Sequence, residues 1–228
     1  MKQCLLVLFI IIGYSLNVSA CSCVYKIDID LWQFVKYEMI VKATIVDISE
    51  AERTEGIHQL YDKKVAIEIG KVFKGKLESE RLTIYSSLDG AACGLPLEVG
   101  QKWLLYLYRF DGKLSTGLCT RSQRVKSKKF DWCADKKFIE HYSCFTGLVE
   151  DESAKGELVN GLPVGEWEFY SMRGNLLSKG IYNTDGKKHG EFISYNTEGK
   201  VMARYIYEDG VLIKTTSYRE DRPIENDR

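Results

Sequence analysis

The sequence has only three histidines, His58, His141 and His189, and they lie far apart. None of them is in an H-x-x-x-H or H-E-x-x-H spacing, so the sequence has no zinc-ligand pair of that kind. Cys93 has no histidine close in the sequence to activate its thiol, and Ser86-Ser87 is not part of a nucleophile-elbow motif. These absences predict a protein that is not an enzyme and that has no cofactor or metal ion of its own.

An excess of one charge and a membrane-spanning apolar run are also missing. The 32 basic and 32 acidic residues give a formal net charge of +0, which gives no reason to expect a nucleic-acid partner. The apolar run Leu5 to Ile12 is too short to cross a bilayer. It follows a basic start at Lys2 and precedes the small residues Val18-Ser19-Ala20, a pattern typical of a signal peptide. We therefore predict that residues 1–20 are removed on export and that Cys21 becomes the N-terminus.

Cysteine is absent after Cys144. Removal of the leader discards Cys4 and leaves six cysteines: Cys21, Cys23, Cys93, Cys119, Cys133 and Cys144. An even number suits complete disulfide pairing in an oxidising compartment, and we expect the protein to be secreted, periplasmic or on the cell surface. The residues Val18 to Cys21 also fit the lipobox of bacterial lipoproteins, in which case Cys21 would carry a lipid and contact a membrane. Lipidation of Cys21 would leave five cysteines, one of which would have no disulfide partner. We therefore favour a free Cys21.

The cysteine-containing half, residues 21–146, has the pattern of a small barrel with flanking helices. We expect a helix over Ile29 to Tyr37, with Asp28 or Asp30 as its N-cap, and another over Phe130 to Tyr142. Strand patterns occupy Met39 to Ile48, Lys64 to Phe73, Arg81 to Tyr85, Lys102 to Arg109 and Lys113 to Cys119, with a hairpin signal at Asp111-Gly112. The predicted fold class is mainly β, with a closed or partly closed five-stranded barrel followed by a β-hairpin array.

The second half repeats itself. Gly165 to Tyr170 returns as Gly190 to Tyr195, and Asn160-Gly161, Asp185-Gly186 and Asp209-Gly210 occupy matching turn positions. Residues 155–218 therefore predict a row of β-hairpins, each covering its neighbour, which resembles MORN-type repeats of bacterial proteins. The shift in composition puts the boundary between the halves near Gly147 to Lys155. We expect an exposed edge strand at Val211 to Tyr218 and a polar tail at 219–228.

Several segments of the first half match a known module in order and spacing. They are Cys21-Ser22-Cys23-Val24, Met39 to Ala43, Cys93 to Lys102, Asp111-Gly112-Lys113 and Thr116 to Cys119. In these segments the chain resembles the netrin-like module, and most closely the N-terminal domain of the tissue inhibitors of metalloproteinases. The resemblance implies an OB-type five-stranded barrel.

The same resemblance implies the disulfides and the functional residues. Cys21 would pair with Cys93 and Cys23 with Cys119, while Cys133 is expected to pair locally with Cys144 because no cysteine lies near Trp32. In these inhibitors the α-amine and carbonyl of the first cysteine chelate the catalytic zinc of the target peptidase. Carried over, Cys21 is the zinc-chelating residue, Ser22, Cys23 and Val24 form the inhibitory wedge, and the flanking loop consists of Ser87, Leu88, Asp89, Gly90, Ala91 and Ala92.

The sequence also departs from that family. Tyr25 stands where the inhibitors usually have proline, and the repeats replace their C-terminal domain. Two functions therefore stay open. The first is an exported inhibitor of a zinc metallopeptidase. The second is a secreted or lipid-anchored adhesion or assembly protein without inhibitory activity, whose repeats bind a protein partner.

Overall fold

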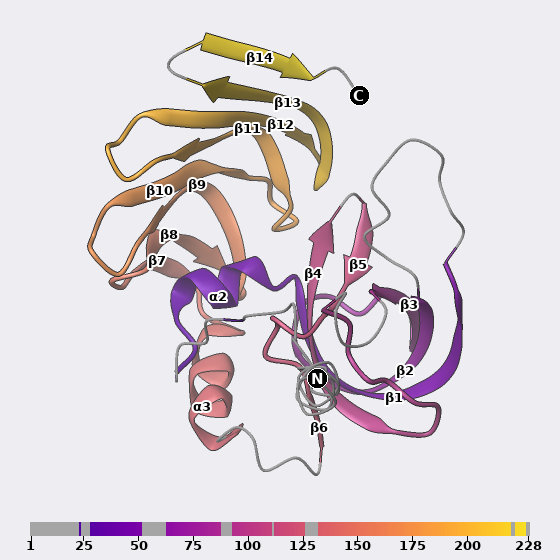
Figure 1. The fold of residues 1–228 in the computed structure, drawn as a ribbon. Helices are drawn as coiled ribbons and strands as arrows, with labels where there is room; N and C mark the ends of the chain where they lie inside the picture. Colours follow the sequence, from indigo (N-terminus) through magenta and orange to yellow (C-terminus); the bar gives the residue numbers. More distant parts are fainter. Residues whose placement is uncertain are drawn as a thin grey trace, which may run out of the picture.

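The computed structural model describes residues 23, 28–51, 63–87, 93–110, 112–125, 132–219 and 222–226. These residues form a barrel from the first half of the chain and an open antiparallel sheet from the second half (Figure 1). The described residues also include two helices, α2 (Leu31–Lys36) and α3 (Trp132–Tyr142). A mainly β fold with a five-stranded barrel is therefore confirmed.

The barrel is closed because β1 pairs with strands on both of its sides. The order β1-β2-β3-β5-β4 returns to β1, and β3 runs parallel to β5 while the other pairs are antiparallel. A short β6 (Gln123–Arg124) is added outside β4. The five barrel strands are β1 (Met39–Glu50), β2 (Lys63–Lys74), β3 (Arg81–Ser86), β4 (Lys102–Phe110) and β5 (Lys113–Ser115).

Most predicted strand ends agree with the structure to within two residues, but β5 is shorter than expected. It ends at Ser115 instead of Cys119. The chain turns there because the Thr120 amide and hydroxyl both donate to the carbonyl oxygen of Gly117, at 3.0 and 2.8 Å. The residues that lead to Cys119 are therefore a turn at the end of the barrel.

Strand β4 is buried on both faces. Trp103, Leu105 and Leu107 point into the barrel, where they join the inner core with residues of β1, β2 and β3. Leu104 and Tyr106 point outward, as the alternation of a strand requires, into a second core shared with α2, α3 and the repeat sheet. The outer face of the barrel is thus the surface on which the second half of the chain packs.

The second half is a single meander of eight consecutive strands. They are β7 (Gly147–Glu150), β8 (Ala154–Val159), β9 (Leu162–Tyr170), β10 (Leu176–Tyr182), β11 (Lys188–Tyr195), β12 (Val201–Glu208), β13 (Val211–Arg219) and β14 (Arg222–Asn226). The sheet begins at Gly147, earlier than the predicted residue 155. The segment predicted as a polar tail contains β14, which pairs with β13. The prediction that Val211 to Tyr218 is an edge strand is therefore wrong, and the edge is formed by β14.

The sequence repeat corresponds to a repeated packing of glycine under an aromatic ring. A Cβ atom on Gly156 would lie 2.3 Å from the ring of Trp167, and one on Gly180 would lie 2.3 Å from the ring of Phe192. The rings continue across the sheet: Tyr182 lies 5.4 Å from Phe192, which lies 5.4 Å from Tyr207. Glycine is required at the two positions because the next repeat's ring covers the backbone.

Helix α2 lies between the barrel and the repeat sheet (Figure 1) and buries Leu31, Phe34 and Val35. It has only six residues, too few to be stable alone. At its start, Asp30 is the N-cap and accepts from the Gln33 amide at 2.8 Å. Two further amides of the helix, those of Leu31 and Trp32, donate to the repeat-sheet half.

The acceptors are side chains of the loop between β7 and β8. Leu31 donates to Asp151 Oδ2 at 2.9 Å, and Trp32 donates to Ser153 Oγ at 3.0 Å. At the other end of the helix, the ammonium group of Lys74, on barrel strand β2, donates to the carbonyl oxygens of Phe34 and Tyr37. The unpaired groups at the two ends of the helix are thus satisfied by different halves of the chain.

Helix α3 is attached to the barrel by a buried charged cluster. Arg121 donates through Nε to Asp135 Oδ2 at 2.7 Å and through a second nitrogen to Oδ1 at 2.5 Å. The hydroxyl of Tyr106 donates to the same carboxylate at 2.7 Å. Arg121 and Asp135 are 3% and 2% exposed, so each depends on the other to remain charged in the interior.

We expect Gly180→Ala to destabilise the protein by about 1–3 kcal/mol, because the added methyl group would overlap the ring of Phe192. Gly70→Ala is the matched control: Gly70 also lies within a strand, but its Cβ would meet its nearest neighbour at an ordinary 3.5 Å. Urea denaturation of the two variants measures the difference. Equal losses for both variants would mean that the ring of Phe192 moves aside freely.

Burial lowers the pKa of Lys74 to about 7, and nearby Glu38 only partly offsets this shift. Between that value and the ordinary 10.5, the unfolded chain binds a proton that the folded protein does not. The free energy of unfolding should therefore rise with pH in this window, by up to about 1.4 kcal/mol per pH unit from this group. Lys74→Met should remove that contribution, whereas Lys71→Met, at an exposed position on the same strand, should keep it.

The measurement is urea denaturation of the three proteins at about pH 7.5 and about pH 9. Thiols are blocked with iodoacetamide beforehand, because a thiolate can exchange with disulfides at high pH. Only the pH dependence is compared, since Lys74→Met also removes two hydrogen bonds. The same pH dependence in the native protein and in Lys74→Met would contradict the assignment.

Candidate functional site

The predicted inhibitory end of the barrel is organised around a disulfide. Cys23 and Cys119 form a bridge, with their Cα atoms 5.2 Å apart and 96 residues between them in the sequence. The bridge ties the segment that precedes α2 to the turn that follows β5. This pairing, which the family resemblance implied, is confirmed.

Cys93 lies beside the turn that carries Cys119. Its carbonyl oxygen accepts a hydrogen bond from the Leu118 amide at 2.7 Å. A Cβ atom on Gly117 would lie 3.0 Å from that same oxygen, so glycine permits the close approach of the two segments. Cys93 is itself disulfide-bonded, and its backbone is left-handed, with φ of 62°. Cys23, Cys93 and Cys119 are therefore gathered at one end of the barrel.

The structure tests the predicted site residues only in part. Cys21, Ser22, Val24 and the loop residues 88–92 lie outside the described residues, as does the predicted signal peptide 1–20. Ser87 directly follows β3, and the Ser86 hydroxyl accepts from the Leu95 amide at 3.4 Å. The two ends of the flanking loop are thus held together, next to the turn that carries Cys119.

The predicted Cys133–Cys144 bridge is wrong, because Cys144 is an exposed free thiol. Cys133 lies in the first turn of α3, and Cys144 follows the last turn. At 1.5 Å per residue the helix separates their Cα atoms by roughly 15 Å. A disulfide needs a Cα separation below about 7 Å. The uninterrupted helix therefore prevents the pairing.

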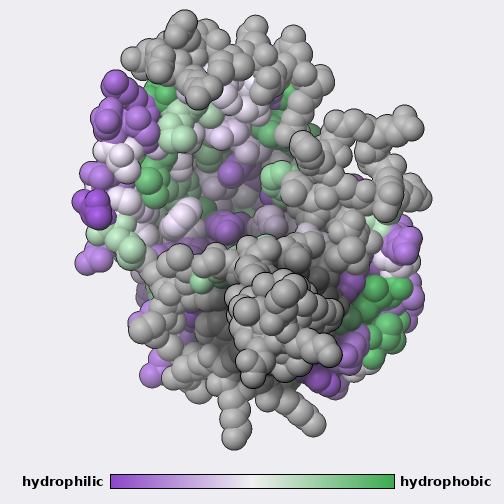
Figure 2. Space-filling view, in the orientation of Figure 1, coloured by the Kyte–Doolittle hydropathy of each residue, from purple (hydrophilic) through white to green (hydrophobic). Residues whose placement is uncertain are grey.

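A second candidate site, which the sequence did not suggest, is a cleft between the barrel and the repeat sheet. Its volume is about 330 Å³, and α2, β4 and strands β9 to β13 contribute to its walls. Figure 2 shows the molecule hollowed between the two halves, with hydrophobic and hydrophilic surface side by side. The aromatic residues that line it are Trp32, Tyr108, Phe110, Phe169, Tyr182, Phe192 and Tyr207.

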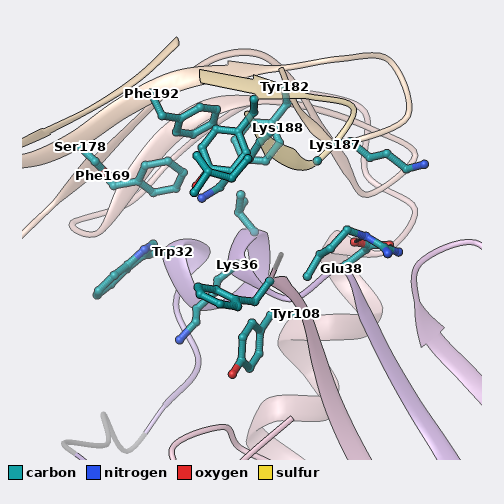
Figure 3. Close-up of a pocket in the computed structure, with 17 residues that line it drawn as sticks. Trp32, Lys36, Glu38, Tyr108, Phe169, Ser178, Tyr182, Lys187, Lys188 and Phe192 are labelled. Atoms are coloured by element: carbon teal, nitrogen blue, oxygen red, sulfur yellow. Dashed lines mark hydrogen bonds and ion pairs between the residues drawn. The ribbon is translucent and has the colours of Figure 1, made fainter. Parts of the chain in front are cut away.

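Two lysines line this cleft, Lys36 from the α2 side and Lys188 from the repeat-sheet side (Figure 3). Lys188, at the start of β11, has its Nζ atom 4.8 Å from the ring centroid of Phe192 and 5.0 Å from that of Tyr207. Lys36, in the last turn of α2, has its Nζ atom 5.6 Å from the ring centroid of Tyr108. These distances are within the range of cation–π contacts.

The surroundings of both lysines disfavour their charged forms. Burial and, to a smaller extent, the positive charge of Lys36 together lower the pKa of Lys188 to about 8. Desolvation also lowers the pKa of Lys36. Within the part of the chain that the structure describes, neither ammonium group has a carboxylate partner.

No signal in the sequence could have brought these lysines together. Lys36 belongs to the helix before the first barrel strand, and Lys188 follows the Asp185-Gly186 turn of the repeats. Each is an ordinary surface residue by local pattern. Their proximity results from the packing of the two halves on α2.

No family model matches the chain, and no curated protein matches it in a sequence comparison. Among the described helices, none has the length and apolar character needed to span a membrane.

We expect the double variant Cys23→Ser/Cys119→Ser to lose about 3–5 kcal/mol of stability, because the bridge closes a long loop in the unfolded chain. Cys144→Ser is the control and should change stability by no more than about 0.5 kcal/mol, since its thiol is free and exposed. Urea denaturation without reductant measures both. If the double variant is as stable as the control, the bridge does not anchor the segment.

Proposed function

We propose that this chain is an exported binding protein built on a netrin-like, OB-type barrel, and that its N-terminal segment inhibits a zinc metallopeptidase. The observation that carries the proposal is the Cys23–Cys119 disulfide. It attaches the chain, two residues after the predicted N-terminus, to the end of the barrel where Cys93 also lies.

The strand order supports the OB-type assignment. A five-stranded barrel of order β1-β2-β3-β5-β4, closed by β1 with β4 and with β3 parallel to β5, has the connectivity of OB barrels. The resemblance in the cysteine segments favours the netrin-like module. The connectivity of the strands is independent of that resemblance and favours the OB-type barrel that such a module has.

The chemistry of inhibition requires a rigid terminus. A catalytic zinc keeps one coordination position for water or substrate. The α-amine and carbonyl oxygen of Cys21 would displace that water as a bidentate ligand, with Ser22 entering the pocket beside the zinc. A terminus already held by disulfides loses little conformational entropy on binding, so its affinity is higher than that of a free peptide. The zinc belongs to the target, and the protein itself performs no catalysis.

The test is inhibition of a panel of zinc metallopeptidases by protein that begins at Cys21, using fluorogenic peptide substrates. A matched protein with one alanine before Cys21 is the control, because the extension converts the chelating amine to an amide. We expect micromolar or stronger inhibition of at least one peptidase by the first protein and loss of that inhibition in the second.

Two results would overturn the inhibitor proposal. One is the absence of inhibition at micromolar concentrations across the panel. The other is equal inhibition by the extended protein, because the free amine would then play no part. The intact mass of the exported protein is measured alongside. A diacylglyceryl group on Cys21 would support the alternative, a membrane-anchored adhesion or assembly protein whose repeats bind the partner.

A further inference from the structure

The cleft between the two halves has the size and position of a ligand site. Its volume of about 330 Å³ is at the lower end of the range of small-molecule pockets. It is formed where α2 and the end of β4 meet the repeat sheet, so a molecule bound there would touch both halves. None of its described lining residues belongs to the segments around Cys23, Cys93 and Cys119, at the disulfide-linked end of the barrel.

The charges that line the cleft do not balance. Among the described residues that line the cleft, four are basic, namely Lys36, Arg109, Lys187 and Lys188, and only Glu38 is acidic. Arg109 is paired with Glu38, its Nε donating to the carboxylate at 2.7 Å. Within the part of the chain that the structure describes, Lys36, Lys187 and Lys188 have no carboxylate partner, and the ammonium groups of Lys36 and Lys188 lie beside aromatic rings of the cleft.

 Of these three, Lys36 lines the cleft from α2 and Lys188 lines it from β11 (Figure 3), so an anion bound in the cleft would be attracted by charges on both of its sides.

Lys155 is an example of a lysine over an aromatic ring whose charge is compensated within the protein. Lys155 lies 5.8 Å from the ring centroid of Tyr170, and its ammonium group is 2.8 Å from the carboxylate of Glu168. On the surface of the sheet, the carboxylate of Glu168 thus balances the positive charge that lies beside the ring. Lys36 and Lys188 have the rings, and the described part of the chain supplies them with no carboxylate.

The rest of the cleft is suited to a flat apolar body. Trp32 stands on the α2 side, and Phe169, Tyr182 and Phe192 stand on the repeat-sheet side (Figure 3). Tyr182 and Phe192 meet edge to face, with centroids 5.4 Å apart, so their positions are fixed by packing. Aromatic side chains held in this way stack on a planar ligand at little cost in conformational entropy.

We infer that this cleft binds a small organic carboxylate with an aromatic body, its carboxylate between Lys36 and Lys188 and its ring against Trp32, Tyr182 and Phe192. The ligand supplies the missing negative charge and fills the apolar part of the cleft. It also joins the barrel-side helix to the repeat sheet. The depressed pKa of Lys188 is consistent with this role, since a bound anion favours the protonated amine.

The experiment is isothermal titration of the full mature protein with naphthoate, alongside naphthamide and acetate. Naphthamide has the same ring without the charge, and acetate has the charge without the ring. We expect naphthoate to bind with one-to-one stoichiometry and to bind at least about 10-fold more tightly than either analogue, because a hydrogen bond to a charged group and the apolar contact each contribute at that level.

Variants locate the binding. Lys36→Met and Lys188→Met should each weaken naphthoate binding by about 10-fold, whereas Lys188→Arg keeps the cation and should retain most of the affinity. Lys71→Met is the matched control: Lys71 also lies over a ring, at 4.7 Å from the centroid of Phe73, but outside the cleft, and its loss should leave binding unchanged. Thermal denaturation without ligand checks that each variant is folded.

Three results would overturn the inference. They are no binding of naphthoate at millimolar concentration, equal binding of naphthoate and naphthamide, and binding that is unaffected by loss of Lys188 in a folded variant. None of them bears on peptidase inhibition, which depends on Cys21. The failure of one proposal is therefore distinguishable from the failure of the other.

Discussion

The architecture depends on how a six-residue helix is made stable. Helix α2 is too short to persist in water, and its backbone groups at both ends need partners. At the start of the helix, Asp151 and Ser153 of the repeat-sheet half accept hydrogen bonds from two backbone amides. At its end, Lys74 of the barrel donates to two carbonyl oxygens. Its apolar face fills the core that the two halves share. The position of the sheet on the barrel, and the cleft beside it, follow from this single arrangement.

Local patterns in the sequence were sufficient for the elements of the barrel and for the repeats, because alternation, turn residues and glycine positions are local signals. The shared core was not predicted. Its signal was present in Trp103 to Leu107, an unbroken apolar run where a strand exposed on one face would alternate. Such a run indicates a strand covered on both sides, but it does not say what covers it. That information depends on contacts between residues more than a hundred positions apart, as between Leu31 and Asp151.

The two candidate sites also differ in how far the sequence could predict them. The Cys23–Cys119 pairing followed from a resemblance that spans the barrel, so it carried information on three-dimensional structure. The pairing of Cys133 with Cys144 rested on elimination, and the continuous helix between them was the physical reason for its failure. Lys36 and Lys188 have no local feature that distinguishes them from surface lysines. Only the packing of the two halves places them in the lining of one cleft.

The hydrogen bonds that join the repeat sheet to α2 lie at one end of the sheet, which has a consequence for how such a protein can change in length. Its β7–β9 end holds the loop that binds α2, so a hairpin inserted there would displace Asp151 and Ser153 from the helix. At the other end β14 pairs only with β13 among the described strands. Hairpins could be gained beyond β14 without disturbing the junction. We therefore expect the number of repeats to vary, across natural or engineered versions of this architecture, by growth from the C-terminal edge.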